Sequence, residues 1–348
     1  MSQKKITIAT RGSMLALWQA RHVEKLLKSQ GMEAALNVIA TTGDKVQDRF
    51  LHEIGGKGLF VKELEEAMLA GDADMAVHSL KDVPVTLPPA FMLGAILPRH
   101  AAHDVLILRR KSAVPAGLAD LAGKTVTAQD LATAGPITVG TSSLRRSALF
   151  ALHVPKFKCV PVRGNVDTRL RKLHEGQFDA LILAGASLER LGENLWTGLP
   201  HQEFIVCKLD PEHFIPCAGQ GALAIEVPKT AELDNGVLKW LAPIHCADTA
   251  FCVAVERGVL KSLGGDCTMP FGAFCRIAEY NGKQMITARA SLLANDGQNA
   301  SGSVECELDA GRTAESVAAK LLSLLAEQGA AEVLAKLELP VPDTLRLH

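Results

Sequence analysis

A short pattern occurs twice along this chain, and it constrains the fold more than any other sequence feature. In the first copy, residues 8–13, a β-branched run ends in threonine, a small polar turn follows, and a helical pattern begins. Residues 139–143 repeat this order. A strand, a tight polar turn and a helix form the opening half of a βαβ unit. The pattern therefore predicts two copies of that unit.

The closing half of the unit also recurs. Gly71 and Gly176 each end a helical pattern, and each is followed three residues later by an aspartate, Asp74 or Asp179, that leads into an apolar run. We expect two α/β domains of similar plan, with a ligand bound in a cleft beyond the carboxyl ends of their strands. The alternative is coincidence, because glycine and aspartate commonly stand between a helix and a strand.

The order of the remaining elements gives the fold class, which is α/β with a smaller C-terminal α+β domain. The first 230 residues alternate strands expected at 6–9, 35–40, 75–78, 137–140, 157–162 and 180–184 with helices expected at 13–29, 59–69, 144–152 and 166–174. Later residues change this order to a long helix at 245–263, strands at 271–279, 284–293 and 302–308, and a helix at 314–325.

The composition excludes several functions. Lysine and arginine number 37 against 38 acidic residues, and aromatic residues are limited to 11 Phe, 3 Trp and 1 Tyr, so we expect no nucleic-acid partner. No apolar stretch approaches the roughly 18 residues of a membrane helix. Thr10-Arg11-Gly12 also breaks an N-terminal run too short for a secretion signal. We expect a cytoplasmic protein without a membrane partner, whose eight cysteines, lacking any CxxC pair, are free thiols.

Basic residues gather between positions 145 and 172, where Asp167 is the only acid. They are Arg145, Arg146, Lys156, Lys158, Arg163, Arg169, Arg171 and Lys172. The first two follow the turn Thr141-Ser142-Ser143 at the start of a predicted helix. Helix N–H groups, hydroxyls and guanidinium forks bind carboxylate or phosphate, so the cluster predicts an anion site. The alternative is a solvated basic face.

Asp82 is the candidate catalytic acid or base. It follows the strand expected at 75–78 within His78-Ser79-Leu80-Lys81-Asp82-Val83-Pro84, so we expect it on a loop at the carboxyl edge of the sheet. Nearby cations such as Lys81 would lower its pKa, which favours a carboxylate that stabilises a developing cation over a proton donor. The alternative is an ordinary turn aspartate.

Two loops and a pair of histidines complete the candidates. Gly55-Gly56-Lys57-Gly58 lacks Walker A spacing and predicts a flexible flap from which Lys57 or Phe60 could reach a cleft. Cys267 lies on a glycine-hinged turn, although most free cysteines are inert core residues. His100 and His103 with Asp104 lack a further ligand pattern, so we expect no metal.

Together these motifs resemble, over nearly the whole chain, those of the hydroxymethylbilane synthase (porphobilinogen deaminase) family. They are Ala9-Thr10-Arg11-Gly12-Ser13, the 55–60 loop, the 78–84 segment, Gly140-Thr141-Ser142-Ser143-Leu144-Arg145-Arg146, Val162-Arg163-Gly164-Asn165-Val166-Asp167-Thr168-Arg169-Leu170, Gly219-Gln220-Gly221-Ala222 and the Cys267 loop. The resemblance implies an enzyme that joins four porphobilinogen molecules stepwise, with loss of ammonia, onto a dipyrromethane cofactor held by a thioether to Cys267. Water then releases the linear tetrapyrrole 1-hydroxymethylbilane, a precursor in haem biosynthesis.

The resemblance also implies roles for individual residues. Asp82 stands at the position of the family's catalytic carboxylate, which contacts pyrrole N–H groups and stabilises cationic intermediates. The family binds cofactor or substrate acid arms at the positions of Arg11, Ser13, Ser79, Lys81, Thr141, Ser142, Ser143, Arg145, Arg146, Arg163, Arg169 and Arg190. To these we add Lys57, Phe60 and Asn165 as binding candidates. Glu53 and Asp266 depart from the family pattern, the first replacing a frequent lysine and the second separating Gly265 from Cys267.

The family fold implies three domains and a monomer, the first two domains resembling the halves of periplasmic binding proteins. By that analogy residues 1–100 and 212–229 form the domain of the Asp82 loop, residues 101–211 form the domain of the arginine-rich anion site, and residues 230–348 form the domain that carries Cys267. Two other classes of function compete with the enzyme. A non-catalytic two-lobed binding protein for an acidic small molecule would give Cys267 no purpose, and a nucleic-acid binder using residues 145–172 would show salt-sensitive affinity.

Overall fold

The computed structural model describes residues 5–41, 61–110, 118–230, 236–266, 268–294 and 296–345. They divide into two compact units. Unit 1 comprises residues 1–100 and 221–250, and unit 2 comprises residues 101–220 and 251–348. The three domain boundaries expected from the family resemblance stay a prediction.

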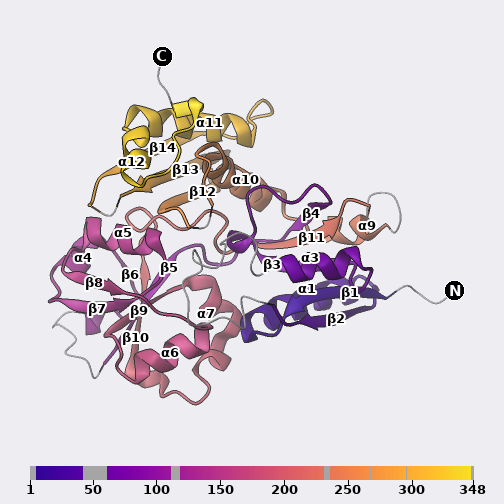
Figure 1. The fold of residues 1–348 in the computed structure, drawn as a ribbon, viewed down its shortest axis with the longest axis horizontal. Coiled ribbons are helices and arrows are strands. Elements are labelled where there is room, and N and C mark those ends of the chain that lie inside the picture. Colours follow the sequence, from indigo (N-terminus) through magenta and orange to yellow (C-terminus); the bar gives the residue numbers. More distant parts are fainter. Residues whose placement is uncertain are drawn as a thin grey trace. The chain divides into compact units, whose positions relative to one another are not determined.

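Unit 1 contains a five-stranded mixed sheet (Figure 1). Its strands run in the order β2 (Ala34–Ile39), β1 (Ile6–Arg11), β3 (Met75–Ser79), β11 (Leu223–Pro228) and β4 (Phe91–Ile96). β1 is parallel to β2 and β3, whereas β11 is antiparallel to β3 and β4. Successive side chains of a strand point to opposite faces. Accordingly Ile8 packs in the core cluster that includes residues of α1 (Met14–Ser29), and Ala9 packs in the cluster that includes Leu64 of α3 (Lys62–Leu69).

Unit 2 contains a six-stranded sheet. Its strands run in the order β6 (Thr125–Val126), β10 (Phe204–Leu209), β5 (Asp104–Arg109), β9 (Ala180–Ala184), β7 (Ile137–Gly140) and β8 (Phe157–Val160). The helices of this part are α4 (Ala128–Ala132), α5 (Leu144–His153), α6 (Val166–His174) and α7 (Gly185–Leu191). Phe150 of α5 packs against Phe214 in the core, with ring centroids 5.1 Å apart.

The two sheets have the same pattern of strand pairing, and equivalent aspartates make the same hydrogen bond in each. β7 is parallel to β8 and β9, as β1 is to β2 and β3, and an antiparallel strand follows in each sheet. Asp74 accepts the N–H of Thr7 at 2.8 Å, and Asp179 accepts the N–H of Thr138 at 2.8 Å. The preceding Gly71 and Gly176 both have φ of +81°, a conformation that glycine adopts without strain. The repeated sequence pattern therefore marks a repeated structure.

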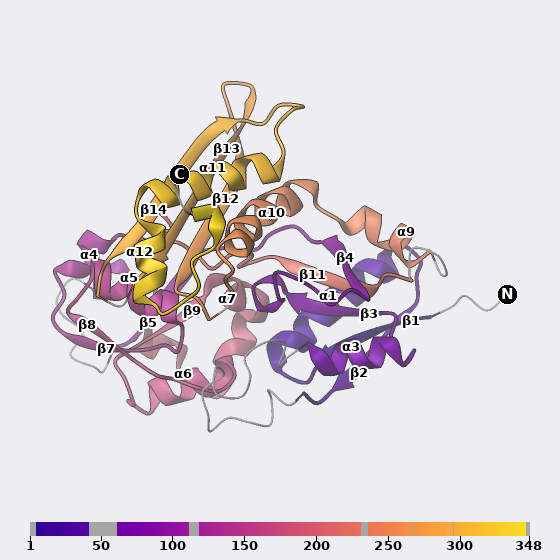
Figure 2. The same ribbon diagram turned by 45° about the horizontal axis from the view of Figure 1, so that its top comes forward.

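Residues 251–348 add a three-stranded antiparallel sheet and its helices to unit 2. The elements are α10 (Ala247–Ser262, which begins in unit 1), β12 (Phe271–Tyr280), β13 (Lys283–Leu293), β14 (Asn299–Glu307), α11 (Ala314–Glu327) and α12 (Ala330–Lys336). Figure 2 shows α11 lying along this sheet. Gly302 permits the close approach, since a Cβ there would lie 2.8 Å from Leu324. The predicted α+β order is confirmed.

Several sequence expectations differ from the structure. The helix expected at 245–263 begins at Ala247, and a separate helix, α9 (Val237–Leu241), and a 3-10 turn precede it. β4, β5 and β10 were not predicted. β5 is buried along nearly its whole length, and such a strand shows a continuous apolar run without alternation. No single helix in the described ranges is long and apolar enough to cross a membrane, although Val237–Ile244 and Ala247–Ser262, bent by 94°, reach that length and composition together.

Candidate active site

A small cavity of about 70 Å³ lies in unit 1 at the carboxyl ends of β1 and β3. Predicted site residues lining it are Arg11, Ser13, Ser79 and Asp82. Arg11 ends β1, and Asp82 ends the 3-10 turn Leu80–Asp82 that follows β3 directly. Parallel strands bring their carboxyl ends to one edge of a sheet, and this topology gathers residues that lie far apart in the sequence.

Hydrogen bonds fix the walls of this cavity. Ser13 caps α1 by accepting the N–H of Ala16 at 3.3 Å, and the Ser79 hydroxyl accepts the side-chain amide of Gln19 at 2.8 Å. The turn that carries Asp82 is closed by the N–H of Val83, which donates to the Leu80 carbonyl at 3.1 Å. Asp82 itself is exposed, so its carboxylate is accessible to a ligand. Lys81, half-buried, does not line the cavity.

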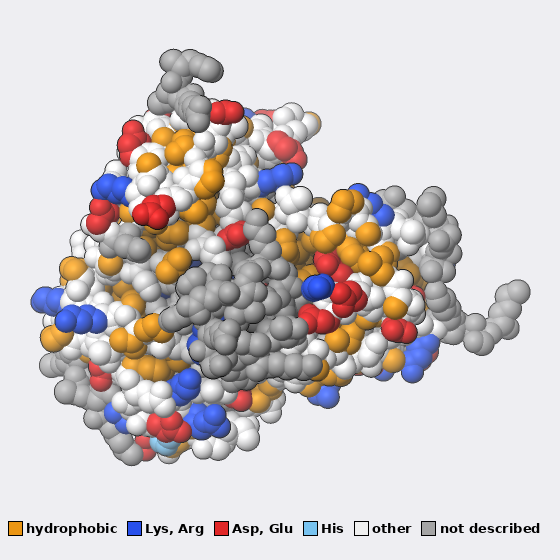
Figure 3. Space-filling view, in the orientation of Figure 1, with side chains coloured by type: hydrophobic (Ala, Val, Ile, Leu, Met, Phe, Trp, Pro, Cys, Tyr) orange, Lys and Arg blue, Asp and Glu red, His pale blue; other side chains and the backbone are white. Residues whose placement is uncertain are grey.

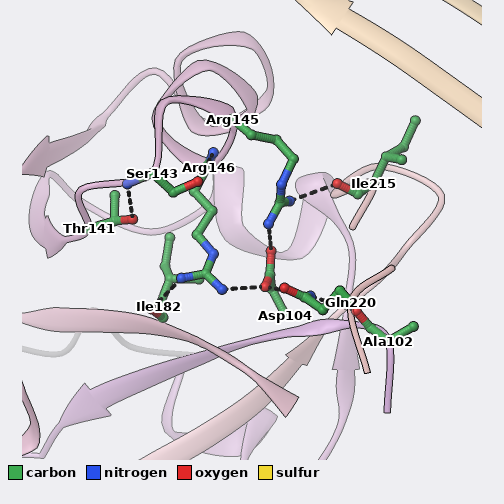
Figure 4. A network of polar contacts seen from close by, with 9 residues as sticks. All are labelled: Ala102, Asp104, Thr141, Ser143, Arg145, Arg146, Ile182, Ile215 and Gln220. Carbon is green, nitrogen blue, oxygen red and sulfur yellow. Dashed lines mark hydrogen bonds and ion pairs between the residues drawn. The ribbon is translucent and has the colours of Figure 1, made fainter. Parts of the chain in front are cut away.

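In unit 2, the predicted Arg145 and Arg146 converge on an aspartate that sequence analysis assigned to no site (Figure 4). Arg145 Nη2 lies 2.9 Å from Oδ2 of Asp104, and Arg146 Nη2 lies 2.8 Å from Oδ1. Each guanidinium also donates through Nη1, Arg145 to the Ile215 carbonyl at 2.7 Å and Arg146 to the Ile182 carbonyl at 3.0 Å. The Gln220 amide donates to Asp104 Oδ1 at 2.9 Å. The two guanidiniums hold the pKa of Asp104 well below its usual range despite complete burial.

This cluster carries an excess of one positive charge. Asp104, Arg145 and Arg146 are 1%, 4% and 7% exposed, and one carboxylate cannot neutralise two guanidiniums. The Nε–H groups of both arginines are buried and lack a hydrogen-bond partner among the described residues. An unpaired buried donor is costly, and an anion is the group that would satisfy both deficits. For these two arginines the solvated basic face considered above is wrong.

Other members of the basic cluster do form a solvated surface. Lys156, Lys158 and Arg171 are exposed. Figure 3 shows one face of the molecule, on which Lys and Arg side chains lie in small groups among acidic and hydrophobic ones. The sequence cluster thus contains a buried arginine pair, three exposed cations and the half-buried Arg163, Arg169 and Lys172, a distinction that spacing alone does not make.

The hydroxyls of the turn before α5 are engaged within the protein. Ser142 Oγ donates to the Val162 carbonyl at 2.8 Å and accepts the Val162 N–H at 3.0 Å. Ser143 caps α5 by accepting the Arg146 N–H at 3.4 Å, and Thr141 Oγ1 accepts the Ser143 N–H at 3.2 Å. These contacts fix the turn beside the arginine pair.

The remaining predicted residues of unit 2 cluster around the turn before α6 or lie on α7. Arg169 Nε donates to the Gly164 carbonyl at 2.7 Å, and the Arg163 carbonyl accepts from Lys172 at 3.1 Å. Asn165 is the exposed residue before α6, without a side-chain cap bond. Arg190 is buried in the last turn of α7. A larger cavity of about 400 Å³ elsewhere in unit 2 is lined by none of these predicted residues.

Three predicted residues, Lys57, Phe60 and Cys267, lie outside the described part of the chain. Beside Cys267, Oδ1 of Asp266 accepts the backbone N–H of Thr268 at 2.9 Å. Sequence analysis assigned no role to Asp104 or Gln19. Asp104 gave no usable signal because its arginine partners are 41 and 42 residues away in the sequence.

The fold and the sites define an α/β protein with duplicated sheets, whose sites suit a small molecule carrying acid groups. One unit presents an accessible carboxylate beside an arginine, and the other buries an arginine pair with spare donors. Among the described residues no group of His, Cys, Asp and Glu could hold a metal ion.

Comparison with known proteins identifies the family. Residues 6–234 match the family model described as porphobilinogen deaminase, dipyromethane cofactor binding domain, and residues 250–326 match the model of the porphobilinogen deaminase C-terminal domain. The chain is 40% identical to a porphobilinogen deaminase of Ralstonia nicotianae, over 97% of this chain and 93% of that relative. It is 39% identical to one of Sulfurimonas denitrificans, over 96% and 98% of the two chains. The chain belongs to the porphobilinogen deaminase family.

The solved structures to which this chain is similar share much less of its sequence. The VFT2 domain of BvgS from Bordetella pertussis aligns with 15% sequence identity and a TM-score of 0.39, covering 68% of this chain and 84% of that one. The periplasmic aliphatic sulphonate binding protein SsuA of Escherichia coli aligns with 15% identity and a TM-score of 0.37, covering 75% and 71%.

Proposed function

We propose that Asp82 is the catalytic carboxylate of this chain and that the cavity around it receives porphobilinogen. The observation that carries this proposal is that Asp82, Arg11, Ser13 and Ser79 line one cavity at the carboxyl edge of the unit 1 sheet. An accessible carboxylate suits a cationic reacting species, while arginine and hydroxyl donors suit the acid arms of the substrate.

The chain is a transferase, a hydroxymethylbilane synthase that joins four porphobilinogen molecules head to tail with loss of ammonia and then releases 1-hydroxymethylbilane by hydrolysis. The family membership supports this enzyme and not the non-catalytic binding protein. The dipyrromethane cofactor supplies the pyrrole chain to which the first substrate is joined.

Asp82 stabilises positive charge as it develops on a pyrrole. A carboxylate about 4 Å from a unit positive charge contributes about 4 kcal/mol at the effective dielectric near a protein surface. Such an energy corresponds to roughly three orders of magnitude in rate. The short turn between Leu80 and Val83 fixes the backbone that carries the carboxylate, which lowers the cost of orienting it.

The arginine pair binds carboxylate arms. Its excess positive charge and the two spare Nε–H donors fit an acid-bearing cofactor or a growing chain that gains carboxylates at each addition. Arg163, Arg169, Arg190, Lys81 and Asn165 are the further candidates in this role. We propose that the cofactor is attached to the Cys267 sulfur. We also propose that Lys57 and Phe60 of the 55–60 loop contact the cofactor or the substrate.

The finer attributes of the protein belong to the same proposal. We infer three domains with the boundaries given above. This division is supported by β11, which lies within residues 212–229 and belongs to the same sheet as β1 to β4. We also infer a monomer in the cytoplasm, without membrane or nucleic-acid partners, on the resemblance and on the near-neutral net charge of −1. Size-exclusion chromatography with light scattering tests the monomer, and a dimer mass would contradict it.

Replacing Asp82 by asparagine tests the central role. We expect Asp82→Asn to keep the cofactor, seen in the intact mass, and to lose about 10²- to 10³-fold in the rate of tetrapyrrole formation, because shape persists while charge is lost. Asp72→Asn, at an exposed position in the same unit, serves as the matched control and should turn over normally. Normal turnover by Asp82→Asn would remove the assignment.

A further inference from the structure

Three titratable side chains form a cluster behind the cavity of Asp82. Nε2 of His78 lies 3.0 Å from Oε2 of Glu226, and the two side chains are only 6% and 0% exposed. Glu65 lies close enough to Glu226 for the two carboxyl groups to interact electrostatically. Neither acid lines the cavity, but His78 does. The cluster is separate from the residues to which a role has been given above.

Sheet register explains why these groups meet. Ala224 pairs with His78 and Glu226 pairs with Ala76 across the antiparallel β3–β11 ladder, so His78 and Glu226 are diagonal neighbours on one face. Helix α3, which contacts β1, β3 and β11, brings Glu65 to that face. The other charged groups on these elements are Lys62, Glu63 and Glu66 of α3 and Arg11 at the end of β1. Of these, Glu66 acts on Glu65, and Arg11 lines the cavity with His78 and Leu64.

Two neighbouring carboxyl groups, one of them buried and the other half-buried, do not both ionise readily. Burial, followed by the neighbouring Glu226, raises the pKa of Glu65 to about 7. Below that pH Glu65 is protonated, so it carries no charge and has a hydroxyl to donate toward Glu226. Above it, the half-buried Glu65 places a negative charge next to Glu226, whose side chain is fully buried.

The cluster is linked directly to the proposed catalytic segment. His78 is followed by Ser79 and by the 3-10 turn that ends at Asp82. The N–H of Leu80 donates to the Ala222 carbonyl at 3.1 Å, so this turn is attached to the segment leading into the strand that bears Glu226. A change of charge between β3, β11 and α3 therefore acts on the backbone that orients Asp82.

We propose that His78, Glu226 and Glu65 are positioning residues for Asp82, and that their packing between β3, β11 and α3 holds its segment in the active arrangement. The inference rests on the proposed role of Asp82. It predicts a decline of turnover on the alkaline side of neutral pH that arises from Glu65, since ionised Glu65 repels Glu226 and loosens the turn.

The test is the pH profile of kcat and KM for Glu65→Gln, with Asp72→Asn, which removes an exposed carboxylate of the same unit, as the control. Glutamine keeps the donor that protonated Glu65 supplies. We expect the kcat of Glu65→Gln to resemble that of the wild type near pH 6. On the alkaline side, the decline of kcat should shift to higher pH by at least about one pH unit. Glu65→Ala, which lacks the donor, should lower kcat at every pH, and Asp72→Asn should follow the wild type.

Two results would overturn the inference. One is a Glu65→Gln profile that superimposes on that of the wild type. The other is an alkaline limb that coincides with loss of folded protein, measured by thermal unfolding at each pH, because the limb would then report stability and not positioning. These outcomes are distinct from failure of the proposed function, which normal turnover by Asp82→Asn would show.

Discussion

Replacing Asp104 by asparagine should destabilise unit 2 more than any change at a surface ion pair. Asp104 is 1% exposed and accepts from Arg145, Arg146 and Gln220 at 2.9, 2.8 and 2.9 Å. Asparagine preserves the shape but leaves two buried guanidiniums without a counter-charge and points an NH₂ group at other donors. Removing one partner of a buried ion pair costs about 3–5 kcal/mol, and we expect a loss of that size in the free energy of unfolding.

The assay is urea unfolding followed by tryptophan fluorescence. Trp18→Phe and Trp240→Phe in the background leave Trp196, which is buried in unit 2 and stacked on His201, as the only reporter. Asp296→Asn, which removes an exposed ion pair with Lys336 in the same unit, is the control and should cost less than about 1 kcal/mol.

The pH dependence of the Asp104 effect has a definite sign. The arginines depress the pKa of Asp104 in the folded state, so its contribution is fully present above the unfolded pKa, near 4, and is lost as pH falls further. The difference between wild type and Asp104→Asn should therefore stay constant from about pH 5 to pH 8 and shrink in more acidic solution. A difference below about 1 kcal/mol at neutral pH, or one that already shrinks near pH 6, would refute the reasoning.

Two further outcomes follow from the structure. Intact mass spectrometry of Cys267→Ala should show a protein without a two-pyrrole adduct, whereas Cys306→Ala should keep it, and an adduct on Cys267→Ala would place the attachment elsewhere. Asp74→Asn and Asp179→Asn should each lower the free energy of unfolding by about 1–3 kcal/mol, because each aspartate accepts the N–H of a strand residue, and equal stability of both variants to wild type would deny the repeat a structural role.

The repeated arrangement of the sheets was predictable because it depends on residues that lie close together in the turns. Gly71 and Gly176 adopt the positive φ that helix ends favour, and Asp74 and Asp179 follow at fixed spacing, so both signals lie within a few residues. The antiparallel strand β5 was not predictable in this way, because its apolar run lacks the alternation of a half-buried strand.

In the candidate site, too, some residues were predictable from local sequence and others were not. Asp82 and Ser79 were located by their place after a strand, and the cavity gathers them because parallel strands end together. The partners of His78 and Arg146 depend on register and packing, since Glu226 and Asp104 reach them from distant strands. A sequence pattern identifies residues able to carry charge, but only the fold determines which charges neutralise one another.

The arginine pair shows why that distinction matters for function. A basic residue kept for solubility remains in water, as Lys156 and Lys158 do. Arg145 and Arg146 are instead buried with one aspartate between them. In such an arrangement the free-energy cost of removing two guanidiniums from water exceeds the electrostatic stabilisation that one carboxylate provides. An apolar pair of similar volume would serve stability at least as well. Two buried guanidiniums with unfilled Nε–H donors are therefore best explained by an anion that binds there, and carboxylates on a pyrrole chain are anions of the required kind.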